Sequence, residues 1–109
     1  MYPLAMPIRT GKHSEAIHFG AIFKRLRKAR GWKITVAAQR CGMNANYLGS
    51  LEKGGNMPSV GSLLEIADVY GTSAADIIRE VEEARHAARK QRAEAEAATE
   101  AQPTSTASD

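Results

Sequence analysis

Short polar side chains recur at helical spacing within residues 41–54 of this chain. Asn46, Ser50 and Lys53 are separated by four and then three residues, so on a helix they would share one face. They offer an amide, a hydroxyl and a single ammonium group, which form hydrogen bonds and attract anions. Ala45 and Gly49 fill the rest of that face. The face is therefore short and polar, and it could press closely against a polar partner.

The neighbouring residues predict the element that carries this face. Gly42 suits the left-handed position that ends a helix, and Asn44 can cap the next helix through its side-chain oxygen. Tyr47, Leu48 and Leu51 fall on the opposite, inner face. Residues 41–54 thus have the pattern of the turn and second helix of a helix-turn-helix, the motif that places one helix in the DNA major groove. The pattern predicts DNA binding.

Other chemistries find no support in the sequence. It contains no Ser-His-Asp constellation, paired-carboxylate site or glycine loop suited to phosphate, so we expect a protein that is not an enzyme. His13, His18 and His86 are scattered, and Cys41 is the single cysteine, so no metal site is predicted. Cys41 is expected to pack in the interior rather than act as a redox switch. No cofactor or small-molecule ligand is predicted.

Charge is divided unevenly along the 109 residues, whose net charge is +3. Residues 1–58 hold ten Lys and Arg against two acids, a net of +8, whereas residues 59–109 hold five against ten, a net of −5. This division suggests an oriented approach to a polyanion. No apolar run approaches the roughly 20 residues that cross a bilayer, and the N-terminus lacks a signal-peptide pattern. With one cysteine, a reducing, cytoplasmic location is expected and no membrane partner.

Hydrophobic periodicity predicts an all-α fold without strands. The expected helices are Phe19–Arg30, Ile34–Arg40, about Ala45–Lys53, one from the cap Ser59 to Gly71, and one from the capping box at Ser73 to about Glu100. We expect residues 1–17 to form a flexible N-terminal arm, 18–82 the helix-turn-helix DNA-binding domain, 83–102 an extended charged Ala-rich helix, and 103–109 a disordered tail.

The last predicted helix has two possible roles beyond Val81. Its positions at a four-three heptad rhythm are small or polar, namely Ala84, Ala88, Gln91, Ala95 and Ala98. Such residues are too small to seal a strong coiled coil. A solvated helix is favoured over a dimer seam, and both interpretations stay open.

From Phe19 to Val81 the chain resembles the Cro/repressor helix-turn-helix family, also called the xenobiotic-response-element family of transcription regulators. The matching positions are Leu26-Arg27, Gly31, Ala38, Gly42, Tyr47-Leu48, Glu52, Gly54, Pro58-Ser59, Leu63 and Ile66-Ala67. The resemblance implies a five-helix, lambda-repressor-like DNA-binding domain. Lys33-Ile34 departs from the family pattern, in which a Ser or Thr cap is followed by a phosphate-binding Gln, and Lys33 is expected to supply that contact by charge.

The resemblance also implies roles for single residues. Arg27 and Glu52 are expected to form an ion pair between the first and third helices. Base edges are expected at Ala45, Asn46 and Ser50. Phosphate contacts are expected at Lys33, Asn44, Tyr47, Lys53, Gly55 and Asn56.

Two functions of different classes fit the sequence. The first is a sequence-specific transcriptional regulator or repressor, a homodimer that reads a palindromic site in double-stranded DNA through its third helix. The second is a protein-interaction module or antitoxin-like adaptor that uses the same fold and the C-terminal helix as a docking arm. The +8 half of the chain favours the first.

Overall fold

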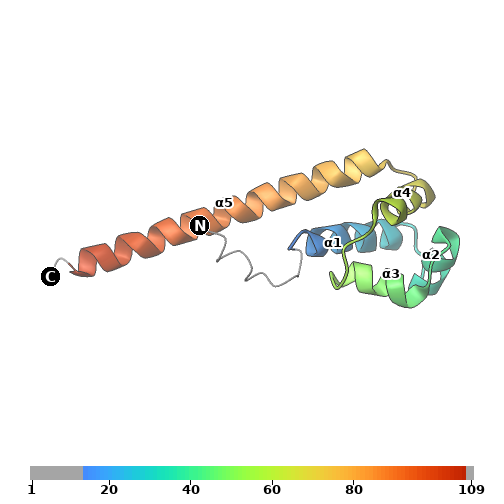
Figure 1. The fold of residues 1–109 in the computed structure, drawn as a ribbon, viewed down its shortest axis with the longest axis horizontal. Helices are drawn as coiled ribbons and strands as arrows, with labels where there is room; N and C mark the ends of the chain where they lie inside the picture. Colours follow the sequence, from blue (N-terminus) through green and yellow to red (C-terminus); the bar gives the residue numbers. More distant parts are fainter. Residues whose placement is uncertain (1–13, 108–109) are drawn as a thin grey trace.

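A computed structural model of the protein describes residues 14–107, with side chains described up to residue 98. Within residues 14–107 the chain forms five helices (Figure 1). They are α1 (Ser14–Ala29), α2 (Ile34–Cys41), α3 (Ala45–Glu52), α4 (Val60–Val69) and α5 (Ala74–Ala107). No strand occurs within residues 14–107. The predicted all-α, five-helix fold is confirmed.

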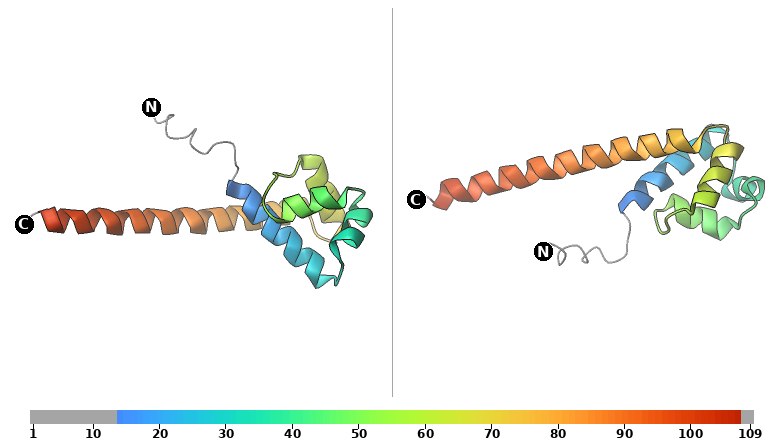
Figure 2. Two further views of the ribbon diagram at one scale, coloured as in Figure 1. Left: turned by 90° about the horizontal axis from the view of Figure 1, so that it is seen from below. Right: turned by 45° about the horizontal axis from the view of Figure 1, so that its top comes forward.

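A single apolar core holds α1 to α4 and the start of α5 together. Its largest fully buried side chains are Phe23, Leu48, Leu51, Ile66 and Ile77, so every helix except α2 contributes at least one. The short α2 contributes small residues instead, since Ala37 and Ala38 are also buried. Figure 2 shows these helices gathered at one end of the molecule while α5 extends away from them.

The turn between α2 and α3 has the predicted geometry. Gly42 ends α2 at φ 69°, where its N–H donates to Gln39 O at 3.1 Å and Met43 N–H donates to Ala38 O at 2.9 Å. This pair of bonds satisfies carbonyls that the helix leaves open. The Asn44 side chain then accepts from Asn46 N at 2.6 Å and caps α3. Both capping predictions are confirmed.

The crossing of α1 and α3 is unusually close at Gly20. A Cβ at this position would lie against Leu51 O and 2.6 Å from Glu52 O. Backbone atoms of a helix are not free to move aside, so a side chain here would push the two helices apart. Gly20 therefore fixes the distance between α3 and the rest of the domain.

The start of α1 differs from the sequence prediction. The helix begins at Ser14, earlier than the predicted Phe19, and residues 14–17 belong to it rather than to a flexible arm. The reason is tertiary: Ala16 is buried, and Glu15 pairs with Arg85 of α5 at 2.8 Å. Residues 1–13 of the predicted arm lie outside the described residues.

The long α5 has two parts. Ile77 and Val81 are buried, and Ala84 and Ala88 are half-buried, whereas residues 89–98 are exposed and project from the domain (Figures 1 and 2). The helix continues through residues 103–107, which the sequence analysis assigned to a disordered tail. Residues 108 and 109 lie outside the described residues. No helix within residues 14–107 combines the length and apolar character of a membrane span.

Candidate nucleic-acid interface

A partly buried ion pair anchors α3 to α1. Arg27 Nε donates to Glu52 Oε2 at 2.7 Å and Arg27 Nη2 to Glu52 Oε1 at 2.9 Å, with side chains 13% and 6% exposed. The predicted contact is present. Arg27 Nη1 also donates to Trp32 O at 2.9 Å, so one guanidinium joins three segments. The hydrogen bonds to Glu52 raise the pKa of Arg27, so the guanidinium stays charged.

The opposite face of α3 is open. Asn46 is exposed, and its side-chain amide has no partner among the described residues. Nothing lies within 4 Å of a Cβ built on Gly49. Ala45, the third residue predicted at base edges beside Asn46 and Ser50, is half-buried and packs on the core. The open face therefore consists of one free amide, a glycine and a small hydroxyl.

Ser50 is held by the loop that follows α3. Asn56 Nδ2 donates to Ser50 Oγ at 2.9 Å, and Gly55 N–H donates to Ser50 O at 2.9 Å. The family resemblance implied phosphate contacts for Gly55 and Asn56 and a base contact for Ser50. In the structure the Gly55 N–H is occupied within the protein. The loop and the helix face thus form one unit.

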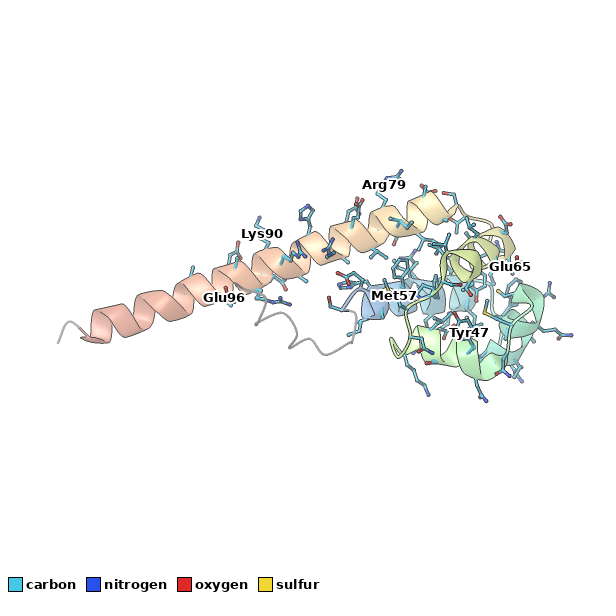
Figure 3. The ribbon with its side chains drawn as sticks, viewed as in Figure 1. Tyr47, Met57, Glu65, Arg79, Lys90 and Glu96 are labelled. Carbon is cyan, nitrogen blue, oxygen red and sulfur yellow. The ribbon has the colours of Figure 1, made fainter. Side chains whose placement is uncertain are left out.

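Two further predicted phosphate contacts also have partners within the protein. The Tyr47 hydroxyl lies 3.2 Å from Ser62 Oγ of α4, and Figure 3 marks Tyr47 on α3. The Asn44 side-chain Oδ1 is occupied by the α3 cap, which leaves its NH₂ group for a ligand. Both residues position α3, and their contacts with DNA stay predictions.

Lysines provide the uncommitted positive charge near α3. Lys33 and Lys53 are exposed and form no ion pair among the described residues. By contrast, Arg25 binds Glu80 through two hydrogen bonds of 2.8 and 3.0 Å, and Arg30 Nη2 donates to Tyr70 O at 2.6 Å. Arg25 of α1 and Arg30, which follows α1, are therefore committed to contacts within the fold, while Lys33 and Lys53 are free to bind a phosphate.

An aromatic and cationic cluster that the sequence did not reveal lies beside α2. Trp32 packs against Tyr70 with ring centroids 5.9 Å apart. Guanidinium carbons of Arg30 and Arg40 lie 5.5 and 4.7 Å from the Trp32 ring centroid. The Trp32 side chain is partly buried and packs against the apolar core. The sequence spacing did not predict the positions of the two arginines, because their contacts with Trp32 depend on how the segment between α1 and α2 folds against α2.

Cys41 and Tyr70 are buried in the same region. Burial raises the pKa of the Cys41 thiol, and burial likewise raises the pKa of Tyr70, whose hydroxyl has no hydrogen-bond partner. A thiol held protonated is a poor nucleophile, which fits the predicted packing role. Within residues 14–107, no three His, Cys, Asp or Glu side chains gather as metal ligands.

Comparison with known proteins supplies independent findings. A family described as a helix-turn-helix domain matches residues 18–79. The chain is 34% identical over 64 residues to an uncharacterized HTH-type transcriptional regulator, y4dJ, of Sinorhizobium fredii, a match that covers 59% of this chain and 83% of the relative. The structure is similar to that of the clp gene regulator ClgR from Corynebacterium glutamicum, with a TM-score of 0.64 and 25% identity. That match covers 76% of this chain and 90% of the other.

Proposed function

The chain belongs to the helix-turn-helix domain family of DNA-binding transcriptional regulators, and on that premise we propose that it is a sequence-specific regulator that reads a palindromic operator as a dimer through α3. The observation that carries the proposal is the contrast within α3. One side is fixed by a partly buried ion pair, and the other presents a short polar surface.

Base reading is assigned to the open face of α3. The free amide of Asn46 can pair with adenine N6 and N7, a contact worth about 1 to 3 kcal/mol of discrimination. Ser50 supplies a hydroxyl. The methyl group of Ala45, half-buried on the core, can meet a thymine methyl only at its exposed edge.

Phosphate binding is assigned to the charges and dipoles around that face. Lys33 precedes α2, Lys53 follows α3, and both are exposed. Further contacts with the DNA backbone are assigned to residues near these two lysines in the sequence, through the polar groups that their internal hydrogen bonds leave free. These residues are Asn44, Tyr47, Gly55 and Asn56. Because each phosphate contact releases a counterion, affinity should fall steeply with salt.

A dimer gives the proposal its geometry. Two copies would place their α3 helices about 34 to 36 Å apart in successive major grooves, so the site should be a palindrome with that half-site spacing. Binding to cellular DNA also implies a cytoplasmic location.

Selection of bound sequences from random double-stranded DNA tests this function. We expect a palindromic motif, an affinity that falls with salt at a slope set by several phosphates, and a solution mass of two chains when bound. A protein that enriches no motif at low salt would not be a sequence-specific regulator.

A second function is favoured by one observation, the exposed and projecting residues 89–98 of α5. As an adaptor, the protein would bind another protein through this arm. That function predicts partner binding that is unchanged in Asn46→Ala and Lys53→Ala, together with no enriched DNA motif.

A further inference from the structure

The loop after α3 controls which way the Ser50 hydroxyl can bond. We propose that Asn56 fixes Ser50 as a hydrogen-bond donor toward DNA, and so makes α3 prefer an acceptor on the base edge beneath Ser50. The inference rests on the proposed DNA-reading function, and it names a specificity-determining role for a loop residue that was expected to contact phosphate alone.

The geometry of the loop supports a fixed arrangement. Asn56 Nδ2 lies 2.9 Å from Ser50 Oγ, and the Gly55 N–H to Ser50 O bond of 2.9 Å folds the loop back onto the last turn of α3. A Cβ on Gly55 would lie 2.9 Å from Ser50 Oγ, so glycine permits this approach. The Asn56 amide is thereby held beside the hydroxyl by backbone as well as by its own bond.

The donors and acceptors available to Ser50 Oγ then determine which way its hydroxyl hydrogen points. A serine hydroxyl carries one hydrogen and accepts through two lone pairs. The Asn56 NH₂ group occupies one lone pair and offers nothing for the hydroxyl hydrogen. Among the described residues, Asn56 is the one hydrogen-bond partner of Ser50 Oγ, and no bond runs back to a carbonyl of the preceding turn. The hydrogen is therefore free to point outward.

The surroundings allow a base edge to reach that hydrogen. Ser50 is half-buried rather than enclosed, and the space at the preceding Gly49 is open. Asn46 stands one helical turn earlier on the same face, about 6 Å away along the axis. Ser50 and Asn46 would thus read neighbouring but separate base pairs. Guanine O6 and N7 and thymine O4 only accept in the major groove and cytosine N4 only donates, whereas adenine offers both an acceptor at N7 and a donor at N6, so guanine or thymine against cytosine is the contrast that reports the hydroxyl direction.

Reversal of the Asn56 chemistry tests the inference. In Asn56→Asp the carboxylate accepts from Ser50, which turns the hydroxyl hydrogen toward the loop and leaves a lone pair outward. We expect selection from random DNA to yield guanine or thymine beneath Ser50 for the wild type, and a shift of about two- to tenfold toward cytosine for Asn56→Asp. Overall affinity should also fall for this variant at every sequence, because it adds a negative charge near phosphate.

Two controls separate this effect from general damage. Ser50→Ala should remove the preference at its own position and leave the base read by Asn46 unchanged. Asn56→Ala, which removes the amide donor, should weaken the preference between guanine or thymine and cytosine. Thermal melting of each variant would show that the domain is folded.

Several outcomes would overturn the inference. An unchanged base preference beneath Ser50 in both Asn56→Asp and Asn56→Ala would show that the loop does not set the hydroxyl direction. A motif selected by the wild type in which Ser50→Ala alters no position would show that Ser50 reads no base. If the wild type itself enriches no motif, the proposed function fails along with the inference. This result differs from the two outcomes above, in which the wild type does select a motif.

Discussion

The two faces of α3 are built on opposite principles. On the inner face, Leu48 and Leu51 are 0% exposed and Glu52 is paired with Arg27. On the outer face, Asn46 is exposed and Gly49 has open space around it. The inner face fixes where the helix lies, and the outer face is left to determine what it contacts. Changes on the inner face should therefore alter stability, and changes on the outer face should alter DNA recognition.

The largest effect should come from the partly buried ion pair. Glu52→Gln removes the carboxylate opposite Arg27 and leaves a poorly solvated guanidinium, at a cost of roughly 3 to 5 kcal/mol in the free energy of unfolding. Denaturant unfolding measures this change. The loss is comparable with the whole stability of a small domain.

A second ion pair, between Arg25 of α1 and Glu80 of α5, provides a matched control. Arg25 and Glu80 also form two hydrogen bonds, yet their side chains are 56% and 42% exposed. Glu80→Gln should therefore cost no more than about 1 kcal/mol. Equal losses in the two variants would show that burial of the inner pair does not matter. An unchanged melting temperature in Glu52→Gln would refute the anchoring role.

Two glycines give the next comparison. Gly20→Ala places a methyl group against Leu51 O and Glu52 O, and should destabilise the domain by about 1 to 3 kcal/mol or more. Gly49→Ala meets nothing, and should stabilise the helix by up to about 1 kcal/mol. Thermal melting distinguishes the signs. Because the Gly49 methyl group would stand on the open face, DNA affinity should fall even as stability rises.

The dependence of stability on alkaline pH tests the burial of two further side chains, Cys41 and Tyr70. Burial raises the pKa of Cys41 above its ordinary 9.0 and that of Tyr70 above its ordinary 10.0, so each stays neutral when folded but ionises when unfolded. Their contribution to stability is complete below about pH 9 and is lost as pH rises above that. The slope should be at most about 1.4 kcal/mol per pH unit for each group.

Unfolding free energies measured between pH 7 and 10.5 would follow this loss. In Cys41→Ala the decline should begin about one pH unit later, near the ordinary pKa of tyrosine. An identical onset in both proteins would mean that Cys41 ionises as easily in the folded state as in the unfolded one.

Features that depend on neighbouring residues in the sequence were predicted better than features that depend on tertiary contacts. Gly42 and Asn44 were predicted as caps because their roles depend on neighbouring residues, and both occupy those roles. The Arg27 to Glu52 pair was expected through the family resemblance alone. Gly20 gave no such signal, since a glycine inside a helix indicates only weak helical propensity. Its importance arises where α1 meets α3.

The candidate site shows the same division. Spacing placed Asn46 and Ser50 on one helix face, and α3 has that face. Spacing did not predict that Asn56 would bind Ser50, because the loop conformation decides it. The early start of α1 was missed for a related reason, since Glu15 pairs with a residue of α5 far along the chain.

The most direct test of the account is a paired measurement on Asn46→Ala. Its thermal melting and its selected DNA motif would be compared with those of the wild type in the same salt. The account predicts an unchanged melting temperature and a loss of about 1 to 3 kcal/mol of discrimination at one base position in each half-site, with the other positions retained. An equal loss of affinity on all sequences, or a motif identical to that of the wild type, would contradict the claim that the outer face of α3 reads bases.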